Sequence, residues 1–464
     1  MSDCGCQQRN EPPNSRREFL ARFGMGLGSL ALASLFSDDL LAAAQTAAAP
    51  VKTTHFPAKA KHVIHIFAQG APSHVDTWDP KPELTRLDEQ SLPGLNGVAM
   101  ASPFKFSRYG KSGIEVSEVF PEIAAHVDDL AIIRSMHTDI PAHDVATVIM
   151  NTGSRLIRPS LGAWALYGLG SENQNMPGFI SLRPNGLVPP GGALNWGSAF
   201  LPGDLQAMSV NTFPPTVAGM VQNIGNTYFN RNEQRRQLDL VQGLNAIHSR
   251  SLQRDPQLEA RIQSFEMAYR MQAEATDAFD VSKEPANTHA LYGDTPQGKQ
   301  LMIARRLIER GVRFVQVWAG GWDHHQDIED RLPASAAEID KPAAGLLADL
   351  KQRGLLESTL IIWGGEFGRT VTRDRNGNDN PGRDHNNKAF SVWLAGGGVK
   401  GGTVYGATDE FGSKAVENPV HVHDLHATIL HLLGFDHTKL TYRYNGRDFR
   451  LTETSGEVVK GIIA

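Results

Sequence analysis

The sequence predicts an α/β fold in which a mostly parallel sheet is covered by helices on both faces. Short apolar runs, which are typical of buried parallel strands, lie at residues 62–68, 130–133, 312–318, 359–363 and 390–394. Helical patterns separate most of these runs, most clearly at residues 298–309 and 335–353. Strands that alternate with helices favour a layered α/β domain.

Two segments interrupt this alternation. Residues 232 to about 280 are charged, rich in glutamine and leucine-spaced, with a break at Pro256, and they predict a pair of helices inserted into the fold. Residues 171–215 are rich in Gly, Pro and Asn, and they predict long loops over one face, where substrate-shaping elements usually lie.

The N-terminal segment is typical of an export signal. Arg16 and Arg17 precede an uncharged segment at 23–36 and small residues at 41–44, which predicts a twin-arginine signal peptide over residues 1–44. An amphipathic first helix or a membrane anchor is the alternative, but the apolar run is short and glycine-rich for a membrane span. We expect a flexible leader over 45–61 and a folded domain over 62–464.

Export would make the twin-arginine machinery a partner of this chain. It would place the protein in the periplasm, in the cell envelope or outside the cell. No other stretch approaches the length of a membrane span, so we expect no transmembrane segment in the mature protein.

Composition excludes several classes of function. The formal net charge of the 464 residues is −5 and the charges are well mixed, so the chain shows no footprint for nucleic acid. The two cysteines, Cys4 and Cys6, lie within the predicted signal. A mature protein without cysteine has no disulfide and no thiolate metal site, so a metal would need His, Asp, Glu or backbone oxygen ligands.

Polar motifs stand beside the predicted strands, where ligands bind in open α/β sheets. The candidate residues are Asp76 after the first strand, Asp323 and His325 after the third, Glu366 and Arg369 after the fourth, and Arg383 and His385 before the last. A lone Asp in a Gly-rich loop is more often a turn former. Together these residues supply carboxylate and imidazole ligands, which suit Zn, Mn or Fe, with Mg or Ca where carboxylates dominate.

The order of these motifs resembles the alkaline phosphatase superfamily, which includes sulfatases and phosphopentomutases. Within it, the chain is most similar to the exported family called domain of unknown function 1501. The matching features are the arginine pair, residues 70–80, 320–323, 365–370 and 382–385, and the tail at 424–430. The resemblance covers nearly the whole chain and implies an alkaline phosphatase-like three-layer sandwich.

The resemblance also implies roles for single residues. Asp323, His325 and His385 match the ligands of one metal, although the Asp–His spacing is shorter here than in alkaline phosphatases. Glu366 matches a ligand of a second metal, but Phe367 stands where a His or Asn ligand is expected. That second site has lost a ligand or is built differently. The first strand of sulfatases ends in paired carboxylates where this chain has Gln69-Gly70, and Asp76 or Asp79 is a candidate substitute from slightly further along the chain.

The place of the superfamily's nucleophile holds a histidine. That nucleophile lies nine residues before a Thr-Gly pair, and counting back from Thr152 leads to His143. A helix beginning there would present free N–H groups to an anion. His143 is therefore a candidate metal ligand, general acid or base, or nucleophile that forms a phosphohistidine.

These features predict an exported, metal-dependent hydrolase of phosphate or sulfate esters, with an anionic ester or a polysaccharide as substrate. The cofactor would be a divalent metal such as Zn, Mn, Mg or Ca. Arg369 and Arg383 are candidate binders of the anionic group, with surface ion pairs as the alternative. The other function considered is a metal- or anion-binding envelope protein without turnover, because a fold alone does not settle activity.

The site hypothesis makes one geometric prediction. Asp76, His143, Asp323, Glu366 and His385 should converge on one rim of the sheet, within roughly ten ångströms of a common centre.

Overall fold

The computed structural model describes residues 53–464 apart from residues 93, 222–223, 226–227, 252–255 and 375–379. The predicted signal at 1–44 and the first part of the predicted leader lie outside the described residues. The chain divides into a large unit, Ala49–Gly225 with Met267–Ala464, and a small unit that contains Asn226–Glu266. The fold of the large unit carries the candidate site.

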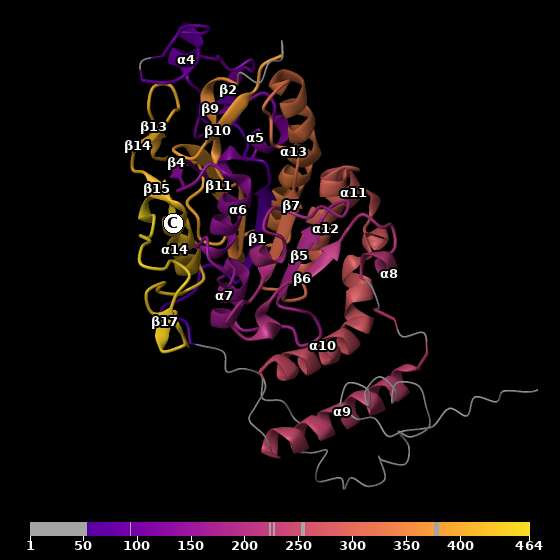
Figure 1. Ribbon diagram of the computed structural model, residues 1–464. Coiled ribbons are helices and arrows are strands. Elements are labelled where there is room, and N and C mark those ends of the chain that lie inside the picture. The colour runs from indigo at the N-terminus through magenta and orange to yellow at the C-terminus, as the bar shows by residue number, and fades with distance from the viewer. Residues whose placement is uncertain (1–52, 93, 222–223, 226–227, 252–255, 375–379) are drawn as a thin grey trace, which may run out of the picture. The chain divides into compact units, whose positions relative to one another are not determined.

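A nine-stranded sheet forms the centre of the large unit (Figure 1). Eight strands follow the order β12-β4-β11-β8-β1-β7-β5-β6, and β15 pairs with β4 beside this path. The strands are β1 (His62–Ala68), β4 (Leu130–His137), β5 (Phe179–Arg183), β6 (Met208–Asn211), β7 (Phe314–Ala319), β8 (Thr359–Gly364), β11 (Phe390–Ala395), β12 (Thr403–Tyr405) and β15 (Val420–His421). Every pairing is parallel except those of β11, which runs antiparallel to β4 and β8.

Alternating side chains of the strands enter two separate hydrophobic cores. On β1, Ile64 and Ile66 pack into a core that includes Leu301 and Leu346. Val63 and Phe67 pack into a second core that includes Trp164. Since successive side chains of a strand point to opposite faces, helices cover both faces of the sheet. This arrangement confirms the predicted three-layer α/β fold with a mostly parallel sheet.

The large unit contains helices at both of the segments, 298–309 and 335–353, where the sequence most clearly predicts them. They are α4 (Pro82–Arg86), α5 (Pro121–Ala124), α6 (His143–Thr152), α7 (Leu161–Leu169), α8 (Val217–Met220), α11 (Ala286–Tyr292), α12 (Pro296–Ile308), α13 (Ile328–Gln352) and α14 (Val422–Leu432). Helices α12 and α13 supply the first core, whereas α7 and α14 supply the second.

Two sequence expectations need correction. Residues 171–215 are not only loops, because β5 and β6 lie within them and extend the sheet beside β7. The last part of the predicted flexible leader is hydrogen-bonded to the end of α14, where Ala60 N–H donates to the Leu432 carbonyl and His55 N–H to that of Gly434. Backbone hydrogen bonds hold this segment in place.

Short hairpins outside the main sheet complete the large unit. They are β2 (Phe106–Tyr109) with β3 (Ile114–Ser117), β9 (Gly368–Arg373) with β10 (Arg383–Asn386), β13 (Ala407–Thr408) with β14 (Ala415–Glu417), and β16 (Tyr442–Tyr444) with β17 (Arg447–Phe449). The β9–β10 pair matters for function, since it sets His385 opposite Arg369.

The small unit falls in the range for which the sequence predicts inserted helices. It contains α9 (Arg231–Ser251) and the first part of α10 (Pro256–Phe279). Arg235 on α9 forms an ion pair with Glu266 on α10, at 2.6 Å between Nη2 and Oε1. Throughout the described residues, every helix is too short or too polar to cross a lipid bilayer.

Candidate metal centre

The candidate residues gather at the carboxyl ends of the parallel strands. Asp323 follows β7 and Glu366 follows β8, while His143 begins α6 shortly after the end of β4. His385 precedes β11, and because β11 runs antiparallel its first residue lies at the same edge as the last residues of its neighbours. The topology therefore brings segments far apart in sequence to one edge of the sheet.

Three histidines surround one oxygen of Asp323. From Asp323 Oδ1, the Nε2 atoms of His325, His143 and His385 lie at 3.1, 3.3 and 3.6 Å. The Nε2 atoms of His325 and His385 are only 2.9 Å apart. We call Asp323, His143, His325 and His385 the histidine cluster. The donor atoms of His143, Asp323 and His385 all lie within 4.8 Å of one another.

Each ring of the histidine cluster has its other nitrogen bound to an acceptor. His325 Nδ1 donates to Asp374 Oδ2 at 2.6 Å, and His385 Nδ1 donates to the Pro141 carbonyl at 3.0 Å. His143 Nδ1 lies 2.5 Å from Glu366 Oε1. Carboxylates and carbonyls only accept hydrogen bonds, so each Nδ1 carries the proton and each neutral ring keeps its lone pair on Nε2.

This arrangement fits a bound cation. Two Nε2 lone pairs at 2.9 Å repel each other unless a proton or a metal ion lies between them. Zn–N and Zn–O bonds of about 2.0–2.1 Å place the ligands of a tetrahedral site about 3.3 Å apart, close to the distances around Asp323 Oδ1. Metal-bound histidines also typically donate their second N–H to a carboxylate or carbonyl, as all three rings do here.

The cluster is strongly charged without a metal. Burial acts to lower the pKa of His143, but its contacts with Asp323 and Glu366 outweigh this effect and raise the pKa to about 9. Burial acts to raise the pKa of Asp323, yet its close contacts with His143, His385 and Arg369 hold it well below its usual range. Asp323 therefore remains an anion, as a metal ligand must.

Asp76 and Arg383 do not belong to the cluster, which corrects both predictions. Arg383 Nε and Nη2 donate to the two carboxylate oxygens of Asp76 at 2.6 and 2.9 Å, and both side chains are fully buried. Ser73 Oγ also donates to Asp76, at 2.5 Å. Opposite charges buried together satisfy each other, so Asp76 has no oxygen free for a metal and Arg383 no exposed donor for a substrate.

Arg369 contacts the cluster but is occupied by the protein itself. Its Nη2 donates to Asp323 Oδ1 at 2.5 Å and to the Gly70 carbonyl. Its Nε donates to the Ala71 carbonyl at 2.9 Å, and its Nη1 to the Arg383 carbonyl at 3.2 Å. With its side chain 1% exposed, Arg369 holds Asp323 and two neighbouring loops in place and does not extend toward a substrate.

Glu366 and Phe367 differ from the predicted second metal site. The Glu366 carboxylate is fully buried and accepts from His143 Nδ1 and from the Gly70 N–H group, at 3.1 Å for the latter. The ring of Phe367 lies 4.8 Å from the rings of both His143 and His385. Phe367 therefore supports the two imidazoles by packing.

Asp374 and Asp384 are functional candidates that the sequence reasoning missed. Asp374 orients His325, and Asp384 Oδ1 lies 3.8 Å from His325 Nδ1. Asp384 stands within the motif before β11, but Asp374 directly follows β9, in a stretch for which no strand was predicted. The sequence does not reveal that β9 and β10 pair and thus bring Asp374 beside His325.

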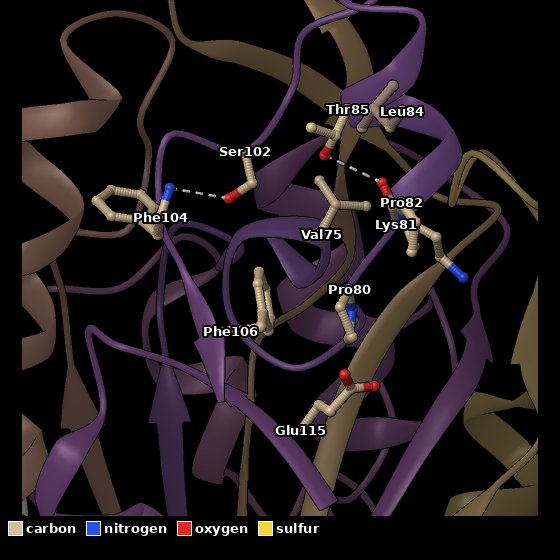
Figure 2. Close-up of a pocket in the computed structure, with 10 residues that line it drawn as sticks. All are labelled: Val75, Pro80, Lys81, Pro82, Leu84, Thr85, Ser102, Phe104, Phe106 and Glu115. Atoms are coloured by element: carbon tan, nitrogen blue, oxygen red, sulfur yellow. Dashed lines mark hydrogen bonds between the residues drawn. The ribbon is translucent and has the colours of Figure 1, made fainter. Parts of the chain in front are cut away.

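A pocket of about 230 Å³ lies apart from this chemistry (Figure 2). Its lining is mainly apolar, from Val75, Pro80, Pro82, Leu84, Phe104 and Phe106, with Lys81, Thr85, Ser102 and Glu115 as the polar members. Thr85 Oγ1 donates to the Lys81 carbonyl, and Phe104 N–H to Ser102 Oγ. Because it contains no residue of the histidine cluster, it does not mark the candidate metal centre.

Comparison with known proteins identifies a family for almost the whole chain. The family model described as "Protein of unknown function (DUF1501)" matches residues 60–463. No curated protein sequence matches the chain.

Several solved structures are similar at low identity. A sulfatase from Pseudoalteromonas sp. is 13% identical, with 81% of this chain and 68% of that chain covered and a TM-score of 0.37. An alkaline phosphatase from the Antarctic bacterium TAB5 is 12% identical, with coverages of 73% and 92% and a TM-score of 0.29. The lipoteichoic acid synthase LtaP from Listeria monocytogenes is 9% identical, with coverages of 92% and 81% and a TM-score of 0.33. Superpositions this loose support no inference about activity.

Proposed function

The chain belongs to the DUF1501 family. From its family membership and from the histidine cluster, we propose that the protein is a metal-dependent hydrolase of phosphate or sulfate esters. One observation carries the metal site: His325 and His385 each donate from Nδ1 to an acceptor and turn their Nε2 atoms toward each other and Asp323. Ester hydrolysis rests on the order of motifs shared with the alkaline phosphatase superfamily, and a polysaccharide ester is the proposed natural substrate.

In this proposal Asp323, His325 and His385 hold one divalent cation. When bound, the cation supplies Lewis-acid polarisation of an ester oxygen and makes water more acidic. Asp374 and the Pro141 carbonyl orient the two imidazoles, and Arg369 keeps Asp323 at the centre of the cluster. A site of two imidazoles and one carboxylate favours cations that bind nitrogen as well as oxygen ligands. We therefore expect Zn or Mn in preference to Mg or Ca.

We also propose export by the twin-arginine pathway to the periplasm, the cell envelope or the medium. The support is the pair Arg16-Arg17 before an uncharged segment. Changing both arginines to lysine should leave the full-length precursor in the cytoplasm, whereas Arg9→Lys should not. Normal export and trimming of the double variant would contradict the proposal.

A metal-binding protein without turnover is the second candidate. The observation that favours it is the lack of a nucleophilic side chain: in the described part of the chain, no Ser, Thr or Cys side chain bonds to the histidine cluster. Water would have to supply the attacking oxygen in a hydrolase of this kind.

Metal analysis followed by an ester screen tests these proposals. The full-length protein should bind one equivalent of Zn²⁺ or Mn²⁺ after chelation and reloading, and it should then hydrolyse aryl phosphates or aryl sulfates. His385→Ala should lose the metal, whereas His289→Ala, on α11 and outside the cluster, should keep it. Equal metal content in the His385→Ala variant and the unchanged protein would contradict the site. A loaded protein that hydrolyses none of these esters would support the binding protein instead.

A further inference from the structure

Helix α6 begins with a side chain that has both ring nitrogens directed at carboxylates. His143 is its first residue, and the preceding Ala142 offers no side-chain cap. His143 Nδ1 lies 2.5 Å from Glu366 Oε1, and its Nε2 lies 3.3 Å from Asp323 Oδ1. The Nε2 atom is buried and has no hydrogen-bond partner. A buried polar atom without a partner is costly, so the position calls for an explanation.

Glu366 determines which nitrogen of His143 is free. Its side chain is fully buried, and its Oε1 atom accepts both the Gly70 N–H group and His143 Nδ1. Because a carboxylate accepts and cannot donate once ionised, the proton of a neutral His143 ring sits on Nδ1. The lone pair then lies on Nε2, which faces Asp323, and His143, Asp323 and His385 together form a group able to hold a metal ion.

We infer that His143 is a further ligand of the metal through Nε2 and that Glu366 is a positioning residue that fixes its tautomer and orientation. The inference rests on the metal site proposed above and deepens it. It replaces the predicted role of Glu366 as a ligand, because both contacts of that carboxylate point to His143 and Gly70. Carboxylates that orient a ligating histidine in this way usually change metal affinity by about 10- to 100-fold.

The assignment also decides between the roles considered for His143. His143 Nδ1 keeps its proton and donates a hydrogen bond to Glu366, while the Nε2 lone pair binds the cation. No lone pair of the ring then remains for attack on a substrate. A phosphohistidine intermediate is therefore excluded in the loaded protein. The competing explanation is an imidazolium that forms only an ion pair with Glu366 and Asp323, without any part in metal binding.

Binding of Co²⁺ separates the two explanations, because its visible spectrum reports the number and type of ligands. The probe is Co²⁺ added to the full-length, chelator-treated protein, with affinity, stoichiometry and absorption as readouts. Glu366→Ala should bind one equivalent with about 10- to 100-fold weaker affinity and a nearly unchanged spectrum. Glu366→Gln should weaken Co²⁺ affinity less than Glu366→Ala, since the amide oxygen of glutamine still accepts a hydrogen bond from His143 Nδ1. His143→Ala should change the spectrum as well as the affinity.

The control is Asp144→Asn, which alters an exposed neighbour on α6. It should match the unchanged protein in both readouts. Far-UV circular dichroism of each metal-free variant identifies misfolding, and His143→Gln repeats the test with a bulkier side chain. If His143→Ala and His143→Gln keep the original affinity and spectrum while His385→Ala loses the metal, this inference is wrong and the metal site stands. If the unchanged protein binds no Co²⁺, the proposed metal site fails, and the inference fails with it.

Discussion

The ion pair of Asp76 and Arg383 shows how one buried contact can position the metal centre. Arg383 donates to Asp76, to the Thr370 carbonyl at 3.3 Å and to the Met100 carbonyl at 3.1 Å. It thereby ties the loop after β1 to strand β10, and His385 lies two residues further along that strand. The pair thus holds the backbone from which a proposed ligand extends.

Removing one partner of this pair should be strongly destabilising. Asp76→Ala leaves the Arg383 guanidinium buried without a counter-ion, which costs about 3–5 kcal/mol in proteins. We expect the free energy of unfolding, measured with urea, to fall by this amount. The exposed Asp144→Ala should lower it by no more than about 1 kcal/mol, the usual effect of an acidic side chain in the first turn of a helix. A similar small change for both variants would show that Arg383 finds another partner.

The contrast between these residues explains what could be predicted about the site. His143, Asp323, Glu366 and His385 were expected to converge because each lies at a predicted strand end or helix start, and topology brings such positions to one edge. Asp76 met the same criterion. Its partner Arg383 lies 307 positions away in the chain, and no local pattern reveals that the two are buried against each other. Long-range pairing of side chains was beyond the reach of sequence reasoning.

At the scale of elements, the turn after β1 brings two loops into close contact. Gly70 has φ +108°, and a Cβ placed on it would lie 2.6 Å from the Asp323 backbone nitrogen and 2.9 Å from the Trp322 carbonyl carbon. The absence of a side chain at Gly70 therefore allows the loop after β7 to approach β1. Asp323 reaches the histidine cluster from that loop.

The variant Gly70→Ala should lose Co²⁺ affinity as well as stability, because the added Cβ meets the loop that carries Asp323. Gly113 is a matched control, since it also has a positive φ of +66° but no atom lies within 4 Å of a Cβ placed on it. Gly113→Ala should cost about 1–2 kcal/mol of stability from the left-handed backbone and leave Co²⁺ affinity unchanged. Gly70→Ala should cost more and also weaken Co²⁺ binding, because Asp323 must move. Equal Co²⁺ affinity in the two variants would contradict this role of Gly70.

The elements that sequence reasoning identified are those with a strong local pattern. The apolar runs at β1, β7, β8 and β11 are completely buried, and burial on both faces produces the continuous apolar sequences that predicted them. Strands β5 and β6 were interpreted as loops because Gly, Pro and Asn dominate the surrounding residues. The antiparallel direction of β11 was not predicted, since a strand's sequence does not encode the direction of its neighbours.

At the scale of the whole molecule, buried neutral histidines link folding to pH. His65 on β1 and His426 on α14 are 3% and 0% exposed. Burial lowers the pKa of His65 to about 4. Burial is also the main cause that lowers the pKa of His426 to about 3, against a hydrogen bond with the Met150 carbonyl that acts to raise it. Both rings are buried, and neither belongs to the histidine cluster.

These two groups should make the protein less stable at acidic pH. In the unfolded chain a histidine takes up a proton near pH 6.5, whereas the folded protein keeps these rings neutral down to about pH 4 and pH 3. Between those limits the unfolded state binds more protons, so the free energy of unfolding should fall as the pH drops below 6.5. Each ring should contribute a loss on the order of 3 kcal/mol by pH 4.

The variant His426→Gln tests this linkage directly. Its amide can still donate to the Met150 carbonyl but does not titrate, so the variant should lose less stability than the unchanged protein between pH 6.5 and pH 4. Unfolding by urea at several pH values, with a chelator present so that metal binding does not contribute, gives the two curves. His289→Gln, on α11, serves as the control and should follow the unchanged protein. Parallel curves for His426→Gln and the unchanged protein would show that His426 takes up its proton over the same pH range in the folded and unfolded chains, because only a difference in proton binding between the two produces a slope.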